Sequence, residues 1–310
     1  MDLIKGNRGW LRQLRGNSLL YILLIPGLLY FIVFKYLPMF GLVVAFQDYS
    51  PFLGVWQSPW VGFAHFSHFL NDPYFLVLLK NTVLLAFYSL LFGFPAPIIF
   101  ALFLNEVRQR LLKRFVQSFT FFPYFISTAV MVSLLYTLLS PQGGLVNQII
   151  QYFGSNPVYF MSDPDYFRSL YVGLGIWHSF GQGAIVYLAA MSGIDPNLYE
   201  AAEIDGANRW KRMWHITLPS IRNVIIIMFI LKAGEILSVD LDRILLMYNP
   251  NLYETADVIQ TYVYRQGFGG NGFPDYSYAA SVGLFQSVVA LALIFIANQV
   301  AKTYSDTRLF

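Results

Sequence analysis

Long apolar stretches alternate with short polar segments along almost the whole chain. A transmembrane helix needs roughly 20 consecutive, mostly apolar residues. Prolines within the first three long stretches predict bends, which membrane helices tolerate when neighbouring groups satisfy the freed carbonyls. The pattern predicts an all-α, polytopic membrane protein with residues 1–310 in a single transmembrane domain. Six stretches are long enough to span: 19–46, 76–104, 116–139, 169–194, 221–247 and 278–301.

The composition agrees with a membrane protein. Of the 310 residues, 56% are hydrophobic and only 12% are charged, whereas soluble domains carry roughly 25% charged residues. The chain has no cysteine, which excludes disulfides, thiol catalysis and thiolate metal sites. The net charge of +3 is small, and the basic residues sit in particular loops, so we expect no nucleic-acid partner.

The basic residues predict how the spans are oriented. Fourteen of the 20 Lys and Arg residues lie before the first span, between spans two and three, between spans four and five (counting Arg222 at the edge of the fifth), or after the sixth. The alternate loops, 47–75, 140–168 and 248–277, hold only Arg168 and Arg265. Because cytoplasmic loops carry an excess of Lys and Arg, both termini are predicted to lie in the cytoplasm.

The loop at 195–219, between the fourth and fifth spans, differs from the other loops. Asp195 suits a helix N-cap and Pro196 the first helical position, while Gly206 breaks the helix. A second short helix is predicted from about Asn208 to Pro219. The pattern indicates a helix–turn–helix at the cytoplasmic surface. From the residues alone it could dock into a groove on a soluble partner or lie on the membrane as an amphipathic hairpin.

Glu200-Ala-Ala, Gly206 and Leu218-Pro219 resemble the EAA loop of bacterial binding-protein-dependent ABC importers. The resemblance implies a type I (MetI-like) permease whose loop is a coupling helix that docks on an ATPase subunit. Two further segments, Leu246–Pro250 and Thr261–Arg265, are similar to the carbohydrate branch, in particular to permeases for complex oligo- and polysaccharides. The residues assigned to the ATPase contact are Glu200, Ala201, Ala202, Asp205, Gly206, Ala207, Trp210, Leu218 and Pro219.

The same resemblance implies the partners. We expect a second homologous permease subunit, two ATPase subunits, an extracytoplasmic sugar-binding protein and an oligosaccharide substrate, with this chain among the lipids of a bacterial cell membrane. The sequence contains no GxxxxGK[ST] motif, so the chain is predicted to be a transport subunit and not an enzyme. It needs no cofactor of its own, because ATP and Mg²⁺ would be bound by the partner ATPase.

Polar side chains within the predicted spans mark a candidate substrate pathway. At about 1.5 Å per residue, Gln182, Glu235 and Gln286 lie about 20–24 Å from the cytoplasmic ends of three spans. Polar groups at such depth usually face the bundle interior or a water-filled cavity. They could instead pair neighbouring helices, and Lys232 could neutralise Glu235. The candidate pathway residues are Trp177, His178, Gln182, Glu235, Asp242, Arg243 and Gln286.

Two other classes of membrane protein remain alternatives. An ion-coupled secondary transporter or channel subunit usually shows inverted repeats, which the pattern lacks. A membrane enzyme needs a nucleophile–base pair or a metal centre at one depth. His65 and His68 lie three residues apart without an evident third ligand, so no metal site is predicted.

Overall fold

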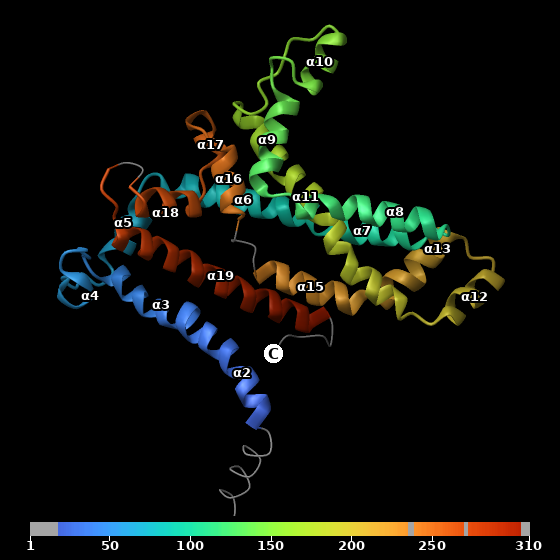
Figure 1. Cartoon of the computed structure of the whole chain (residues 1–310), viewed down its shortest axis with the longest axis horizontal. Helices are drawn as coiled ribbons and strands as arrows, with labels where there is room; N and C mark the ends of the chain where they lie inside the picture. The colour runs from blue at the N-terminus through green and yellow to red at the C-terminus, as the bar shows by residue number, and fades with distance from the viewer. Residues whose placement is uncertain (1–17, 235–238, 270–271, 305–310) are drawn as a thin grey trace, which may run out of the picture.

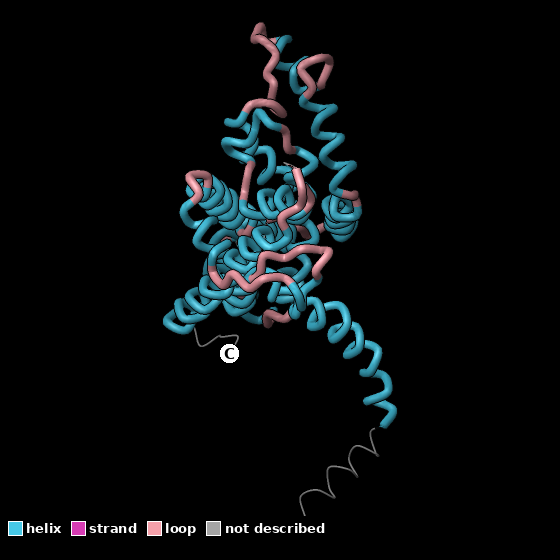
Figure 2. The backbone as a smooth tube through the Cα atoms, turned by 90° about the vertical axis from the view of Figure 1, so that its left-hand side faces the viewer, coloured by secondary structure: helices cyan, strands magenta, loops and turns pink. Residues whose placement is uncertain are grey.

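The structure is a computed structural model that describes residues 18–234, 239–269 and 272–304. Helices make up most of this part of the chain, and its one extended pairing is an isolated antiparallel bridge between Gln47 and Trp60. The helices form an elongated bundle from which two segments depart: α2 and α3 on one side, α9 and α10 on another (Figures 1 and 2).

The first span is a helical rod that stands apart from the bundle. It consists of α2 (Ser18–Phe31), the π-helical turn η1 (Ile32–Tyr36), α3 (Leu37–Met39) and the 3₁₀ segment η2 (Phe40–Phe46). Its apolar window has none of its residues buried. Only η2, at the far end of the rod, packs against the last helix, α19 (Tyr276–Tyr304). An apolar rod exposed on all sides needs lipid or another subunit around it.

The centre of the bundle is α11 (Pro164–Ser192), which packs against α6 (Phe75–Gly93), α7 (Pro95–Asn105) and α8 (Arg110–Phe121). Gly181 allows the closest of these approaches, because a Cβ there would lie 2.2 Å from the carbonyl oxygen of Thr120 on α8. On the other side of the bundle, α15 (Arg222–Gly234) lies along α19.

Shorter helices complete the two ends of the bundle. The end on the left of Figure 1 carries α4 (Gly54–Gln57), α5 (Ala64–Asn71), α16 (Leu241–Met247), η5 (Pro250–Leu252), α17 (Tyr253–Ala256) and α18 (Ile259–Gly267). The right-hand end carries α12 (Pro196–Ile204), α13 (Arg209–Arg212), η4 (Met213–Thr217) and α14 (Leu218–Ser220). The projecting arm consists of η3 (Phe122–Phe125), α9 (Thr128–Leu139) and α10 (Leu145–Tyr152).

Within the part of the chain that the structure describes, three helical segments are long and apolar enough to cross a membrane: Leu19–Phe46, Phe75–Asn105 and Tyr276–Ile296. Two bent pairs, Arg110–Phe125 with Thr128–Leu139 and Arg209–Ser220 with Arg222–Gly234, would raise this to five. The 29 residues of α11 are long enough to span, but their glycines and polar side chains make the helix less apolar than the others.

Two of the six predicted stretches, 116–139 and 221–247, do not form one continuous span. The stretch 116–139 turns by 101° between η3 and α9, where Pro123 lies in a 3₁₀ turn, Ile126 is extended and the hydroxyl of Ser127 caps α9. The sequence predicted a bend near Pro123, but it did not predict that the angle would be as large as 101°. The stretch 221–247 corresponds to α15 and the separate helix α16, with residues 235–238 between them outside the described residues.

Candidate functional site

The first arm of the 195–219 loop is α12, which is closed at both ends by its own residues. The carboxylate of Asp195 accepts a hydrogen bond from the backbone N–H of Asn197 at 3.0 Å, and Pro196 begins the helix. At the other end the N–H of Gly206 donates to Glu203 O, and the N–H of Ala207 donates to Ala202 O. These two bonds form a Schellman motif, which requires the left-handed backbone that Gly206 adopts at φ +77°.

The second arm of the loop runs from α13 through η4 to α14, and its side chains contact the first arm. Arg212 forms an ion pair with Glu203 at 2.7 Å, and the hydroxyls of Tyr199 and Thr217 lie 2.9 Å apart. The ring of Trp210 meets Phe103 of α7 edge-on, with centroids 5.9 Å apart. The loop is therefore a braced hairpin attached to the bundle.

The structure brings all the predicted coupling residues together on this hairpin. Three are half-buried: Ala202, Ala207 and Leu218. The other six are exposed: Glu200, Ala201, Asp205, Gly206, Trp210 and Pro219. Ile204 is 87% exposed beside them. An ordered hairpin with an exposed isoleucine and small residues offers a surface for another protein.

A cavity of about 280 Å³ lies in the middle of the bundle, between α6, α11, α15 and α16. Its polar lining includes Ser89, Ser179, Lys232, Asp240 and Arg243. Pockets that enclose a small ligand usually measure about 300–1,000 Å³. This central cavity is therefore slightly smaller than a typical complete ligand site.

Arg243 is the buried charge of this cavity. Its guanidinium donates to Asp240 at 2.7 Å and lies 5.0 Å from the centre of the Tyr171 ring. The hydroxyl of Tyr171 in turn accepts a hydrogen bond from the backbone N–H of Asp240 at 2.9 Å. Gly175 makes room for the guanidinium, since a Cβ at that position would lie 2.5 Å from it.

The other predicted pathway residues are spread over several surfaces. Trp177 and Gln182 are exposed on α11, and Asp242 is exposed on α16. His178 stacks on the ring of Tyr124, with centroids 5.7 Å apart. Gln286 is buried on α19. Of the predicted set only Arg243 lines the cavity, while Glu235 lies outside the described residues.

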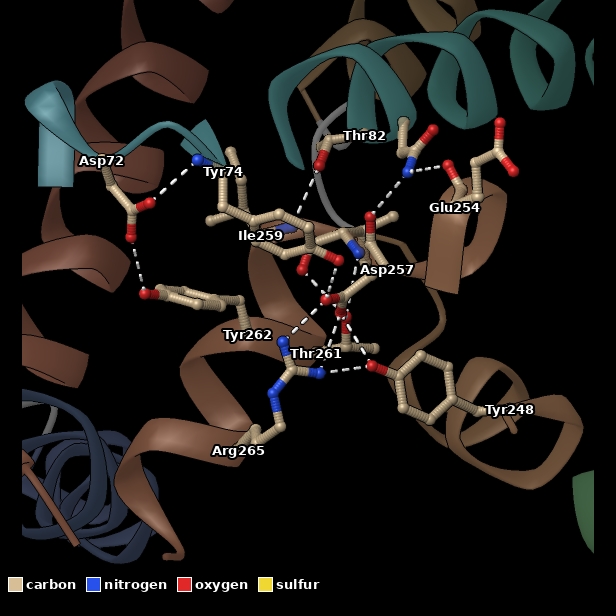
Figure 3. A network of polar contacts seen from close by, with 12 residues as sticks. Asp72, Tyr74, Thr82, Tyr248, Glu254, Asp257, Ile259, Thr261, Tyr262 and Arg265 are labelled. Carbon is tan, nitrogen blue, oxygen red and sulfur yellow. Dashed lines mark hydrogen bonds and ion pairs between the residues drawn. The ribbon is translucent and has the colours of Figure 1, made fainter. Parts of the chain in front are cut away.

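At the opposite end from the hairpin, a buried carboxylate organises several helices (Figure 3). Asp257 has no solvent exposure and accepts hydrogen bonds from Tyr74 (2.8 Å), Tyr248 (2.8 Å), Thr261 (2.6 Å) and Arg265 (2.6 Å). Burial first, and then the bond to Asp257, raise the pKa of Tyr74 well above its ordinary value. Burial and the charge of Asp257 do the same to the pKa of Tyr248, so both phenols remain hydrogen-bond donors at neutral pH.

The backbone around Asp257 is fixed to α6 as well. The amide of Asn81 donates to the carbonyls of Glu254 (2.9 Å) and Asp257 (3.1 Å) and accepts a hydrogen bond from Arg168 of α11. We call this set, Asp257 with Tyr74, Asn81, Arg168, Tyr248, Thr261 and Arg265, the Asp257 network. Sequence reasoning missed its centre, because a single aspartate in a polar loop carries no signal of burial. The buried partner Asn81, inside an apolar stretch, was the one available hint.

The fold and these sites define the class of protein. Residues 93–308 match the family described as the binding-protein-dependent transport system inner membrane component. The chain is 46% identical over 301 residues to Protein LplB of Bacillus subtilis (strain 168), covering 97% of this chain and 94% of that protein. It is 44% identical over 298 residues to the polygalacturonan/rhamnogalacturonan transport system permease protein YteP of the same organism, covering 96% and 92%.

Solved structures agree. A chain of a bacterial ABC transporter involved in the import of the acidic polysaccharide alginate superimposes with a TM-score of 0.88 at 40% identity, covering 96% of this chain and 100% of that one. The alginate transporter in complex with an alginate pentasaccharide-bound periplasmic protein gives a TM-score of 0.87 at the same identity, covering 96% and 99%. This chain belongs to the family of binding-protein-dependent transport system inner membrane components, and it is a permease subunit of the ABC importer type.

Family membership confirms the predicted all-α permease fold. It decides against the alternative of an ion-coupled secondary transporter or channel subunit. In the described part of the chain, no three His, Cys, Asp or Glu residues gather as a metal site would require.

Proposed function

We propose that this chain forms half of the translocation pathway of an ATP-driven importer for oligosaccharides or polysaccharide fragments. Its partners would be a second homologous permease, two ATPase subunits that bind ATP and Mg²⁺, and an extracytoplasmic sugar-binding protein. Among its relatives, YteP is named for polygalacturonan and rhamnogalacturonan, and the solved transporter imports alginate. This chain itself would hold no ATP site and carry out no catalysis.

The observation that carries the proposal is the position of α11. This single helix ends at the hairpin, lines the cavity near its middle and contributes Arg168 to the Asp257 network near its start. A continuous helix transmits displacement along its length, so movement of the hairpin by an ATPase would reach the cavity. We propose that the hairpin is the coupling element and that it faces the cytoplasm, with both termini on the same side.

A second permease fits two further features. The cavity between α6, α11, α15 and α16 is slightly smaller than a typical ligand site, and the first span stands exposed beside the bundle. A homologous subunit would complete the cavity and cover part of that rod. The exposed side chains of Trp177, Gln182 and Asp242 are then candidates for the pathway between the two subunits.

Site-specific cross-linking tests the coupling role. Because the natural chain has no cysteine, a single cysteine can be introduced without background. A201C, on the exposed face of α12, should cross-link to the ATPase subunit in the assembled complex. N156C, exposed in the loop between α10 and α11, is the matched control and should cross-link to the binding protein or to nothing. Labelling of A201C from outside intact cells would contradict the proposal.

Transport in proteoliposomes tests the substrate. The complete complex should hydrolyse ATP faster when the binding protein is loaded with oligosaccharides released from an acidic polysaccharide, and should accumulate them. Stimulation by an amino acid or a phosphate ester, with none by any saccharide, would overturn the assignment.

A further inference from the structure

Arg243 sits in the cavity with most of its hydrogen-bonding capacity unused. The residue is only 9% exposed, and it lies in the first turn of α16 with its side chain on the cavity wall. A guanidinium has five N–H donors. Its one hydrogen bond from the side chain goes to Asp240, and its buried Nε has no partner among the described residues. Burying such donors without acceptors is costly unless a ligand supplies them.

The surroundings hold this guanidinium in one place. Tyr171 lies against it on one side, Asp240 binds it on another, and Gly175 of α11 leaves the space that it occupies. A group fixed in this way loses little side-chain entropy when a ligand binds. The pair with Asp240 also balances the charge of Arg243 while the cavity is empty, which reduces the cost of burying it.

The chemistry points to a carboxylate. The planar guanidinium matches the two oxygens of a carboxylate, and such charge-assisted bonds are stronger than bonds to neutral hydroxyls. The hydroxyls of Ser89 and Ser179, also on the cavity wall, suit the ring hydroxyls of a sugar. One sugar unit that carries a carboxylate would satisfy both kinds of group.

We propose that Arg243 binds the carboxylate of a uronate unit during passage, so that this permease itself prefers acidic over neutral saccharides. The inference rests on the proposed function and adds to it a specificity-determining residue. Asp240 holds the guanidinium ready, and Gly175 is the position that allows it to reach the cavity.

The test compares two probes of equal length: a fully acidic oligogalacturonide and its partly methyl-esterified form. Their initial uptake rates are measured with the complete complex in proteoliposomes, at saturating loaded binding protein. Because the same binding protein serves every variant, its own preference cancels when a variant is compared with the natural complex. R243Q should lower the acid-to-ester ratio by roughly tenfold or more, since it removes a charge-assisted hydrogen bond.

Further variants separate recognition from folding. R243K keeps the charge but loses the planar fork, and should give an intermediate ratio. G175A places a Cβ 2.5 Å from the guanidinium and should lower the ratio while Arg243 is still present. The double variant D240N/R243Q carries neither charge and should also lose the preference. R114Q is the control: it alters an exposed arginine of α8 that does not line this cavity, and should leave the ratio unchanged.

The outcomes distinguish the two proposals. If the natural complex takes up neither probe, nor any other saccharide, the proposed function fails. If it takes up both and R243Q lowers both rates equally, or leaves both unchanged, Arg243 is a structural residue and this inference is overturned. A shift in the ratio for R114Q as large as that for R243Q would overturn it as well.

Discussion

The polar contacts within the hairpin join residues that are near in sequence, whereas several hydrogen bonds of the Asp257 network join distant ones. Glu203 and Arg212 are nine positions apart, and Tyr199 and Thr217 are 18 apart. At the other end of the bundle, the hydrogen bond from Tyr74 to Asp257 joins two residues that are 183 positions apart in the sequence. The ion pair of the hairpin is partly exposed, while the carboxylate of Asp257 is fully buried.

This difference suits two mechanical roles. The second arm of the hairpin packs on the bundle through Met213 and Trp210, while the exposed face of α12 is left free for a partner. A network of long-range buried bonds instead fixes α6, α11 and the 248–265 segment to one another. The comparison therefore predicts that damage at the network end lowers the stability of the whole domain, while damage at the hairpin weakens only partner binding.

The largest expected effect is that of D257N. It would leave the buried Arg265 without its ion pair, and breaking such a pair costs about 3–5 kcal/mol. We expect a loss of stability in the lower part of that range, because the Arg265 side chain is 15% exposed. The midpoint of thermal unfolding in detergent should fall clearly. D165N, at an exposed aspartate near the start of α11, is the control and should change it little. Equal midpoints for the two variants would break the comparison.

The next effect is that of N81A, at the point where α6 meets the network. The substitution removes an amide that serves two carbonyls and one guanidinium, leaving buried polar groups unsatisfied at a cost of about 1–3 kcal/mol. Thermal unfolding should again shift, while the affinity of the purified permease for its ATPase should stay the same. Loss of ATPase binding without loss of stability would contradict the role given to Asn81.

The same contrast explains what the sequence could predict. The hairpin was predictable because its cap, its break and its closing proline are local signals: Asp195, Gly206 and Pro219 each act on neighbouring backbone. The Asp257 network was not, because nothing near Asp257 in the sequence shows that Tyr74 will lie beside it. Which distant residues pair depends on how α6, α17 and α18 pack together. The sequence alone does not reveal that packing.

The pathway residues fall between these two cases. Depth along a helix can be counted from the sequence, but direction around it depends on which neighbours the helix meets. Gly181 and Gly183 bring α8 and Pro97 of α7 close to α11, and Gln182 between them is exposed. Arg243 was among the candidate pathway residues chosen from the sequence. Its place on the cavity wall follows from the separate helix α16, which the apolar pattern of 221–247 concealed.

At the hairpin, G206A should affect coupling more than stability. An L-residue in the left-handed conformation costs roughly 1–2 kcal/mol, and the strain falls on a turn whose bonds are local. The turn of the free permease should rearrange to relieve this strain, and docking must restore it. We therefore expect the affinity for the ATPase subunit to drop by about tenfold, since 1.4 kcal/mol corresponds to that factor. The unfolding midpoint should remain close to that of the natural chain. A large fall in the midpoint would show that the hairpin is as tightly built into the bundle as the Asp257 network.

The smallest effect distinguishes the two glutamates of α12. Glu203 is 66% exposed on its side chain and pairs with Arg212, and an exposed ion pair contributes about 0–1 kcal/mol. Glu200 is exposed and forms no ion pair within the described residues, so its charge is available to a partner. E203Q should therefore change ATPase affinity by about twofold or less, and E200Q by more. Both would be measured by titrating the purified ATPase subunit onto the permease at two salt concentrations, because an intermolecular charge contact weakens as ionic strength rises. If E203Q had the greater effect, the Glu203–Arg212 brace, and not direct contact through Glu200, would determine how the hairpin binds its partner.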